Sequence, residues 1–295
     1  MKKGKPTNPT LKLLLERASC RDFADRPVPP EVLRQVLEAG VHGPTGGNLQ
    51  PYSIIQVREP ATRRRLCELC GNQRFIAEAP VNLLFCIDWH RSRRWAELEV
   101  APFTATDSFR MFWISFQDTV ICAQGIATAA ESVGLGSVYV GLVLECLIEL
   151  RELFALPDGV LPVVLLCVGY PRSKPRPAGK LGPELIVHEE SYEEPEDDAL
   201  REAFGRKHQG KARKITDERV HELARVCREV HGPELAARCI ERTEQNGCIT
   251  AAQAYFALQY PADRMVEDND VFVRQMEELG FGWFRRYVPP GERDA

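Results

Sequence analysis

The chain has 295 residues, of which 44% are hydrophobic and 27% are charged, and its formal net charge is -4 at pH 7. These values are ordinary for a soluble globular protein, and the small acidic excess excludes a global electrostatic attraction to nucleic acid. The strongest apolar run, Val160–Gly169, is interrupted by Pro162 and falls well short of the roughly 20 residues that a membrane helix needs. We therefore expect a buried strand there, and neither a membrane nor a nucleic acid as partner.

Ten cysteines are scattered along the chain. Most lie inside apolar segments, where we expect them to be small buried residues of a protein in a reducing, cytoplasmic compartment. Lys12 splits the apolar residues near the Met-Lys-Lys start, which argues against a secretory signal. Only Cys67 and Cys70 form a C-x-x-C, and no second ligand pair accompanies them. We expect no metal site and interpret the pair as structural, with a redox dithiol as the alternative.

The first 190 residues alternate between helical and strand patterns. Helices are expected at 9–17, 28–39, 61–70, 108–133 and 144–154, and strands at 52–57, 81–88, 137–140 and 161–168. The longest helix is apolar on nearly all sides and contains Gly125, so it should be buried and closely approached by another helix. The alternation predicts an α+β fold with a central mixed or antiparallel sheet flanked by helices.

The character of the sequence changes after residue 189. An acidic run at 189–198 is interpreted as a solvated linker, and a basic patch at 207–214 follows it. Helical patterns then occupy 217–230, 233–246, 249–258 and 266–279. We therefore expect a core of residues 1–195 and a helical C-terminal extension of residues 196–295, acting as a cap or a dimer arm.

Three separated segments suit an anionic, planar ligand. Arg17, Ser19 and Arg21 place two planar cations and a hydroxyl within five residues, a set that can hold phosphate. Segment 43–51 is a loop rich in glycine and amide side chains, and segment 134–141 is a second glycine-rich turn. Each segment also has a purely structural interpretation: a solvated helix end for the first, a turn before a strand for the second, and a helix stop for the third. The glycine spacing of segment 134–141 does not fit a dinucleotide-binding fold.

Taken together, these segments resemble the nitroreductase family. The resemblance rests on RASCRDFADRPVPPEVLRQVLEAGVHGPTGGNLQPYSII, GNQRFIAEAP, AAESVGLGSVYVG, LPDGVLPVVLLCVGYP and LIVHEESY. It covers residues 14–192, resumes near 265–284, and is closest to the oxygen-insensitive, NADPH-preferring group of nitroreductases and flavin reductases. The middle of the helical extension, about 210–262, is longer than is usual in that group.

The resemblance implies an FMN site at the boundary between the two subunits of a homodimer. Within one subunit, Arg17 and Ser19 would hold the FMN phosphate, and Arg21 would reach the pyrimidine end of the ring or the ribityl chain. Val140 and Gly141 would present backbone N–H groups near flavin N5.

Further contacts are implied from other segments. The residues of the first glycine-rich loop that would reach the flavin from the partner subunit are Pro44, Thr45, Gly46 and Asn48. Gln73 would bond the polar edge of the ring or the ribityl chain. Lys180 stands where the family has a phosphate-binding arginine. The family also has a lysine two residues earlier, where this chain has Ala178, and Arg176 is the candidate replacement.

By the same resemblance the protein is an FMN-dependent oxidoreductase that passes hydride from NADPH or NADH to nitroaromatics, quinones or similar electrophiles. The kinetics would be ping-pong, and no catalytic side chain is required because the flavin carries the chemistry. His42 and His188 are the tempting acids, although packed or solvated histidines are the expected outcome. Two alternatives stay open: a flavin enzyme of another class, such as dehalogenation or flavin breakdown, and a non-catalytic FMN-binding or regulatory protein.

Overall fold

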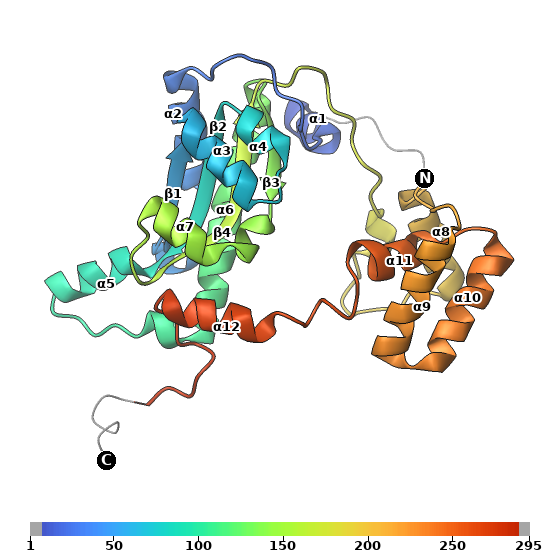
Figure 1. The fold of residues 1–295 in the computed structure, drawn as a ribbon. Helices are drawn as coiled ribbons and strands as arrows, with labels where there is room; N and C mark the ends of the chain where they lie inside the picture. Colours follow the sequence, from blue (N-terminus) through green and yellow to red (C-terminus); the bar gives the residue numbers. More distant parts are fainter. Residues whose placement is uncertain (1–7, 289–295) are drawn as a thin grey trace. The chain divides into compact units, whose positions relative to one another are not determined.

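The computed structural model describes residues 8–288 (Figure 1). The expectation about a secretory signal rests partly on the first seven residues, which lie outside this range. The described chain forms two compact units, one made of residues 8–177 with 273–288 and the other of Ala178–Phe272. No helix of the described residues is both long and apolar enough to cross a bilayer.

The first unit carries the sheet. Its elements up to the second strand are α1 (Pro9–Glu16), α2 (Pro30–Val41), the 3-10 turn η1 (Gly46–Asn48), β1 (Tyr52–Val57), α3 (Pro60–Leu69), α4 (Arg74–Glu78) and β2 (Val81–Asp88). Then follow α5 (Trp89–Leu98), η2 (Ala105–Asp107), α6 (Phe109–Ser132), β3 (Gly136–Val140), η3 (Leu142–Glu145), α7 (Leu147–Phe154) and β4 (Val160–Gly169). The order confirms the predicted alternation of helices and strands.

The four strands form one antiparallel sheet in the order β1-β2-β4-β3. This is the antiparallel form of the predicted central sheet. Pro162 lies in β4, a central strand, at the place where the pairing with β2 shifts register between Phe85 and Cys86. Proline cannot donate a ladder hydrogen bond and is tolerated inside a sheet at such bulges, which explains how the apolar run 160–169 remains a strand.

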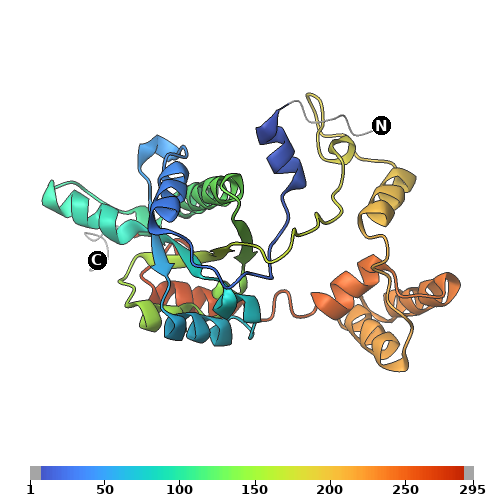
Figure 2. The same ribbon diagram turned by 90° about the horizontal axis from the view of Figure 1, so that it is seen from above.

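Helices cover both faces of the sheet (Figure 2). Leu83 and Phe85 of β2 pack in a cluster with residues of α2 and α6. Leu84 and Cys86, which point the other way because strand side chains alternate, pack in a second cluster with residues of α3, α4 and α7. The result is a three-layer arrangement with a core on each side of the sheet.

The close approach of α2 to α6 depends on two glycines. A Cβ added at Gly40 would overlap the side chain of Ile126, and a Cβ added at Gly125 would lie 3.2 Å from Cα of Gly40. The predicted close packing against Gly125 is therefore confirmed. This pair fixes α6 against the segment that leads into the first glycine-rich loop.

The second unit is helical. Its elements are η4 (Pro183–Leu185), α8 (Asp197–Lys207), α9 (Asp217–His231), α10 (Pro233–Asn246), α11 (Ala251–Gln253) and the π-helix η5 (Ala254–Gln259). α12 (Asn269–Glu278) crosses the boundary back into the first unit. There the chain beyond α12 is held by Leu279, whose carbonyl accepts the backbone N–H of Gly159 at 2.7 Å.

Three features differ from the expectations. Helices α4, α5 and α8 were not predicted, and the run 189–198 is not wholly a linker, because its last two residues open α8. Asp197 and Asp198 occupy the first turn of α8, and Arg206 and Lys207 its last turn, an arrangement that complements the helix dipole. The helix expected at 249–258 is a short α-turn that continues as a π-helix.

Candidate functional site

The segment that carries the first predicted cluster is paired with edge strand β3. Ser19 forms a parallel bridge with Ser137, and the backbone N–H of Cys20 donates to the carbonyl of Ser137 at 2.9 Å. Ala18 and Cys20 are buried whereas Ser19 and Arg21 are exposed. Since alternate side chains of an extended segment share a side, the pairing directs the Ser19 hydroxyl and the Arg21 guanidinium outward together.

Arg17 lies at the end of α1 with its side chain against β3. Its Nη2 donates to Oγ of Ser137 at 3.3 Å, and its guanidinium carbon lies 5.9 Å from the centre of the Tyr139 ring. The Nε atom is buried and has no hydrogen-bond partner within the described chain. A buried donor without an acceptor costs free energy, so this arginine is suited to receive an anion.

Two titratable groups, Glu131 and Tyr139, lie close enough to Arg17 to interact with its charge. Burial raises the pKa of the Glu131 carboxyl above its ordinary value, while the positive charge of Arg17 lowers it. Burial likewise raises the pKa of Tyr139 to about 12, and Arg17 opposes this shift too. Tyr139 is therefore neutral at physiological pH, and Glu131 is the acidic group that competes with an incoming anion for Arg17.

Open space lies where β3 ends. Gly141 has an ordinary helical backbone conformation, and a Cβ added to it would meet no described atom within 4 Å. Val140, the residue before it, is buried in the core. A side chain at Gly141 would thus project into unfilled space, which is the property expected of a position that faces a ligand.

The turn between α3 and α4 borders the same region. A Cβ at Gly71 would lie 3.1 Å from Cδ1 of Leu142, the residue next to Gly141. Gln73, which precedes α4, donates from Nε2 to the carbonyl of Cys70 at 3.2 Å. The Arg21 guanidinium lies 6.0 Å from the centre of the Phe75 ring. The structure therefore distributes the predicted residues along β3: Arg17 and Ser19 lie beside Ser137 near its start, and Val140 and Gly141 lie at its end, next to the turn that holds Gln73.

The loop with the second predicted cluster is held by α6. The backbone N–H of Gly46 donates to both carboxylate oxygens of Asp118, at 3.0 and 3.2 Å. Thr45 Oγ1 accepts the backbone N–H of Gln50 at 3.2 Å, and Asn48 has a left-handed backbone with φ of 56°. Pro44 and Asn48 are exposed. The loop therefore contains a defined 3-10 turn that ends at the exposed Asn48.

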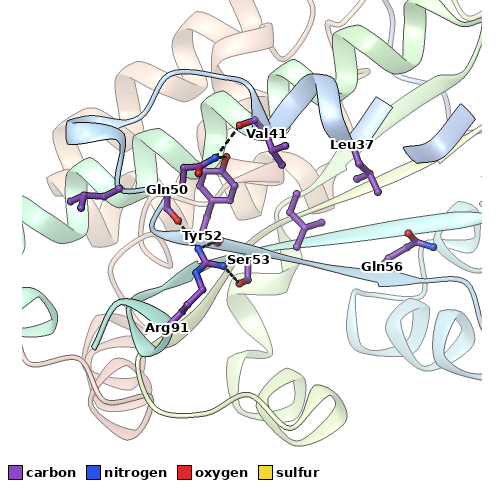
Figure 3. Close-up of a pocket in the computed structure, with 9 residues that line it drawn as sticks. Leu37, Val41, Gln50, Tyr52, Ser53, Gln56 and Arg91 are labelled. Atoms are coloured by element: carbon purple, nitrogen blue, oxygen red, sulfur yellow. Dashed lines mark hydrogen bonds between the residues drawn. The ribbon is translucent and has the colours of Figure 1, made fainter. Parts of the chain in front are cut away.

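A cavity of about 590 Å³ lies beside β1 at the end of this loop (Figure 3). Arg91 of α5 donates from Nη2 to the carbonyls of Gln50 and Tyr52, at 2.6 and 2.9 Å. Gln50 in turn donates from Nε2 to the carbonyl of Val41 at 3.0 Å. None of the predicted flavin residues lines this cavity, so the network serves to fix where the loop joins the strand.

The two clusters lie toward opposite edges of the sheet. The loop 43–51 leads into β1, and segment 17–21 pairs with β3, while β1 and β3 are the two edge strands. Three inter-strand steps separate these edges, or about 14 Å. Within the described residues, the two predicted clusters are therefore separate from one another.

Ser137 and Asp118 were not identified from the sequence. Ser137 stands inside the quoted glycine-rich turn, but nothing local shows that its hydroxyl meets an arginine 120 residues away. Asp118 left a clearer signal, since it is an acid in a helix whose other charged residues are only Arg110 and Glu131, and it is only 4% exposed. A buried acid in such a helix indicates a specific partner.

Other predicted residues lie in less informative surroundings. Arg176 is exposed on the loop after β4, and Lys180 is exposed in the helical unit, so their roles stay predictions. His42 contacts the carbonyl of Glu38 through Nδ1 at 2.8 Å, and His188 accepts the backbone N–H of Glu193 at 3.2 Å. No group of three potential metal ligands occurs among the residues described.

Residues 14–170 match the Nitroreductase family. The chain belongs to this family. It is 34% identical over 186 residues to the oxygen-insensitive NADPH nitroreductase of Salmonella typhimurium, covering 63% of this chain and 75% of that protein. It has the same identity and coverage with the NAD(P)H FMN reductase of Bacillus subtilis.

Solved structures of nitroreductases share the fold. Nitroreductase A from Vibrio parahaemolyticus is 31% identical, with a TM-score of 0.62 over 67% of this chain and 82% of that one. NfrA1 from B. megaterium is 27% identical, with a TM-score of 0.70 over 93% of this chain and 100% of that one. The nitroreductase-like fold inferred from the sequence is thus confirmed.

Proposed function

We propose that this nitroreductase is an FMN-dependent enzyme that transfers hydride from NADPH or NADH to small electrophiles such as nitroaromatics or quinones. The observation that carries the proposal is the buried Nε of Arg17, which has no partner within the described residues and stands beside Ser137 and the exposed Ser19. The names of the two curated relatives, a nitroreductase and an FMN reductase, agree with this chemistry.

The residues present fit FMN. A phosphate monoester needs charge-assisted donors, and Arg17 with Ser19 supplies a guanidinium fork and a hydroxyl. A flat ring needs space beside the protein backbone, and Gly141 leaves such space. Arg21, exposed next to this region, would supply positive charge near the ring.

When bound, FMN supplies the hydride-accepting and hydride-donating chemistry of the reaction. The protein binds and orients it: Arg17 and Ser19 would hold the phosphate, and Val140, Gly141 and Gln73 would direct polar groups at the ring and the ribityl chain. Arg21 and Arg176 would stabilise negative charge through fixed positive groups. Because both substrates would use one slot in turn, we expect ping-pong kinetics.

The enzyme would work as a homodimer, because the two predicted clusters lie apart within the described part of one chain. A second chain would bring its loop residues Pro44, Thr45, Gly46 and Asn48 to the cluster around β3. The helical extension would act as a cap or as a dimer arm up to residue 272, since residues 273–288 belong to the unit that carries the sheet. A cytoplasmic location would suit the free thiols.

An apolar surface on α6 supports this assembly. Phe109 and Trp113 are each 53% exposed, Phe116 36% and Val120 37%. They follow one another at spacings of four, three and four residues, so they share one face of the helix. A continuous stripe of large exposed apolar side chains is typical of a protein interface. The Gly46–Asp118 contact places the loop beside this helix.

Anaerobic stopped-flow spectroscopy tests the proposal. Purified protein loaded with FMN is mixed with NADPH or NADH, and the flavin absorbance is followed. We expect fast bleaching with one of the two nucleotides, followed by recovery when a quinone or nitroaromatic is added. A non-catalytic flavin carrier would show no fast bleaching. Bleaching without recovery on any such acceptor would indicate a flavin enzyme of another class.

A further inference from the structure

The helical unit holds two thiols in direct contact. Cys227 of α9 donates its S–H to Sγ of Cys239 of α10, with 3.0 Å between the sulfurs. The two helices pack side by side and are joined through Gly232 alone (Figure 1). Both cysteines are free. A disulfide requires sulfurs about 2 Å apart, so closing the pair needs a movement of only about 1 Å.

The surroundings of the two sulfurs differ. Cys227 is buried in the small core of this unit with Leu223 and Val226, and this burial raises the pKa of Cys227 to about 12. Cys239 is partly exposed and lines a cavity of about 310 Å³. An oxidant from solvent therefore reaches Cys239 first, with Cys227 directly behind it.

The backbone of Cys239 is held in place from two sides. Thr243 Oγ1 and Gln253 Nε2 both donate to its carbonyl, at 2.8 and 3.0 Å. Two cations and one carboxylate, Arg238, Arg242 and Glu241, line the same cavity. Reactive cysteines are those that an oxidant can reach from solvent, whereas buried structural cysteines are inert. The core cysteines Cys70, Cys86 and Cys167 offer a contrast, since each is fully buried.

We infer that Cys227 and Cys239 form a reversible disulfide when the protein meets a hydroperoxide. The Cys239 thiolate attacks one peroxide oxygen: an S–O bond forms, the O–O bond breaks, and the hydroxide released takes up a proton. The Cys227 sulfur then attacks Cys239, the S–S bond forms, and the sulfenic oxygen leaves as water with the Cys227 proton. Two thiols and one hydrogen peroxide give one disulfide and two waters. A dithiol reductant reverses the change.

The disulfide would link α9 covalently to α10 within the helical unit. It does not involve the proposed flavin residues, and its formation does not depend on the proposed hydride transfer. A transient disulfide of this kind is compatible with a reducing compartment, where such bonds serve redox sensing.

The test is chemical mapping of the flavin-loaded protein. Protein treated with hydrogen peroxide is alkylated, digested without reduction and analysed by mass spectrometry. We expect a linked peptide joining Cys227 to Cys239, the loss of two thiols per chain, and full recovery with dithiothreitol. Cys248, a partly exposed thiol of the same unit, provides a matched control: Cys248→Ser should form the link at the wild-type rate.

Two variants separate the steps. Cys239→Ser should abolish the linked peptide and leave Cys227 as a thiol. Cys227→Ser should leave Cys239 as a sulfenic acid that a dimedone probe captures, because no second thiol resolves it. In wild-type protein, a link from Cys239 to Cys248 or to another chain, or oxidation of Cys239 to sulfinic acid with Cys227 still free, would overturn the inference. So would full retention of both thiols.

Discussion

Gly46 donates its backbone N–H to both carboxylate oxygens of Asp118, so that a buried acid on α6 holds the loop that precedes β1. Burial raises the pKa of Asp118 above its ordinary value of 3.8, while the hydrogen bond from Gly46 lowers it and the net shift is upward. The folded chain therefore binds the Asp118 proton more tightly than the unfolded chain does. This contribution to stability is complete below pH 3.8 and is lost as the pH rises through the raised pKa.

Asp118→Asn tests this titration. The stability of the wild type relative to this variant should be greater near pH 4 than near pH 7, as measured by urea unfolding at both values. Asp25→Asn, at an exposed acid of the same unit, controls for the general effect of removing a charge. If the difference in unfolding free energy between the wild type and Asp118→Asn is the same at both pH values, the pKa of Asp118 is not raised in the folded chain.

Arg17→Ala should weaken FMN binding by about 1.5–3 kcal/mol, because a charge-assisted contact to phosphate is lost. Fluorescence titration of the apoprotein with FMN measures the change. Arg34→Ala removes an exposed arginine from α2 and should leave the affinity as it is. If Arg17→Ala binds FMN as tightly as the wild type, Arg17 is not part of the site.

Substitutions at Gly136, the first residue of β3, and at Gly141, the residue after this strand, should have different effects on stability and on FMN binding. Gly141→Leu should fold with nearly wild-type stability, because its side chain enters open space, but its FMN affinity should fall at least about tenfold through steric exclusion. Gly136→Ala should instead lower the free energy of unfolding by about 1–3 kcal/mol, since its Cβ would lie 2.7 Å from Cβ of Cys20. Thermal unfolding and FMN titration of both variants provide the measurements. Unchanged FMN affinity in Gly141→Leu would move the flavin away from this position.

Trp113→Glu should convert the homodimer to monomers, because it places a charge in the apolar stripe of α6. Sedimentation velocity measures the assembly, and the flavin content should fall with it if the partner's loop completes the site. Val230→Glu on α9 is a comparable change from an exposed apolar residue to an acid and should leave the dimer intact. A monomeric wild type that retains FMN would argue against a shared site.

Local patterns predicted most of the first unit. The continuous apolar run 81–88 and the β-branched segment 52–57 gave β2 and β1 with their observed bounds. The missed helices lacked such a pattern: α4 has only five residues, and α5 is largely polar, with three arginines among ten residues. Its Arg91 nevertheless fixes the end of the glycine-rich loop, through contacts that span about forty residues of sequence.

The sequence alone determined the family, the antiparallel or mixed sheet flanked by helices, and the three segments in which the predicted ligand-binding residues are concentrated. Each of these follows from patterns or motifs made by residues that are close together in the sequence. Tertiary structure alone decided that Ser137 meets Arg17, that Asp118 holds Gly46, and that Cys227 touches Cys239. Each of these contacts joins residues of two different elements, and no local sequence pattern predicts which elements will meet. The contacts form only when strand pairing and helix packing bring the elements together.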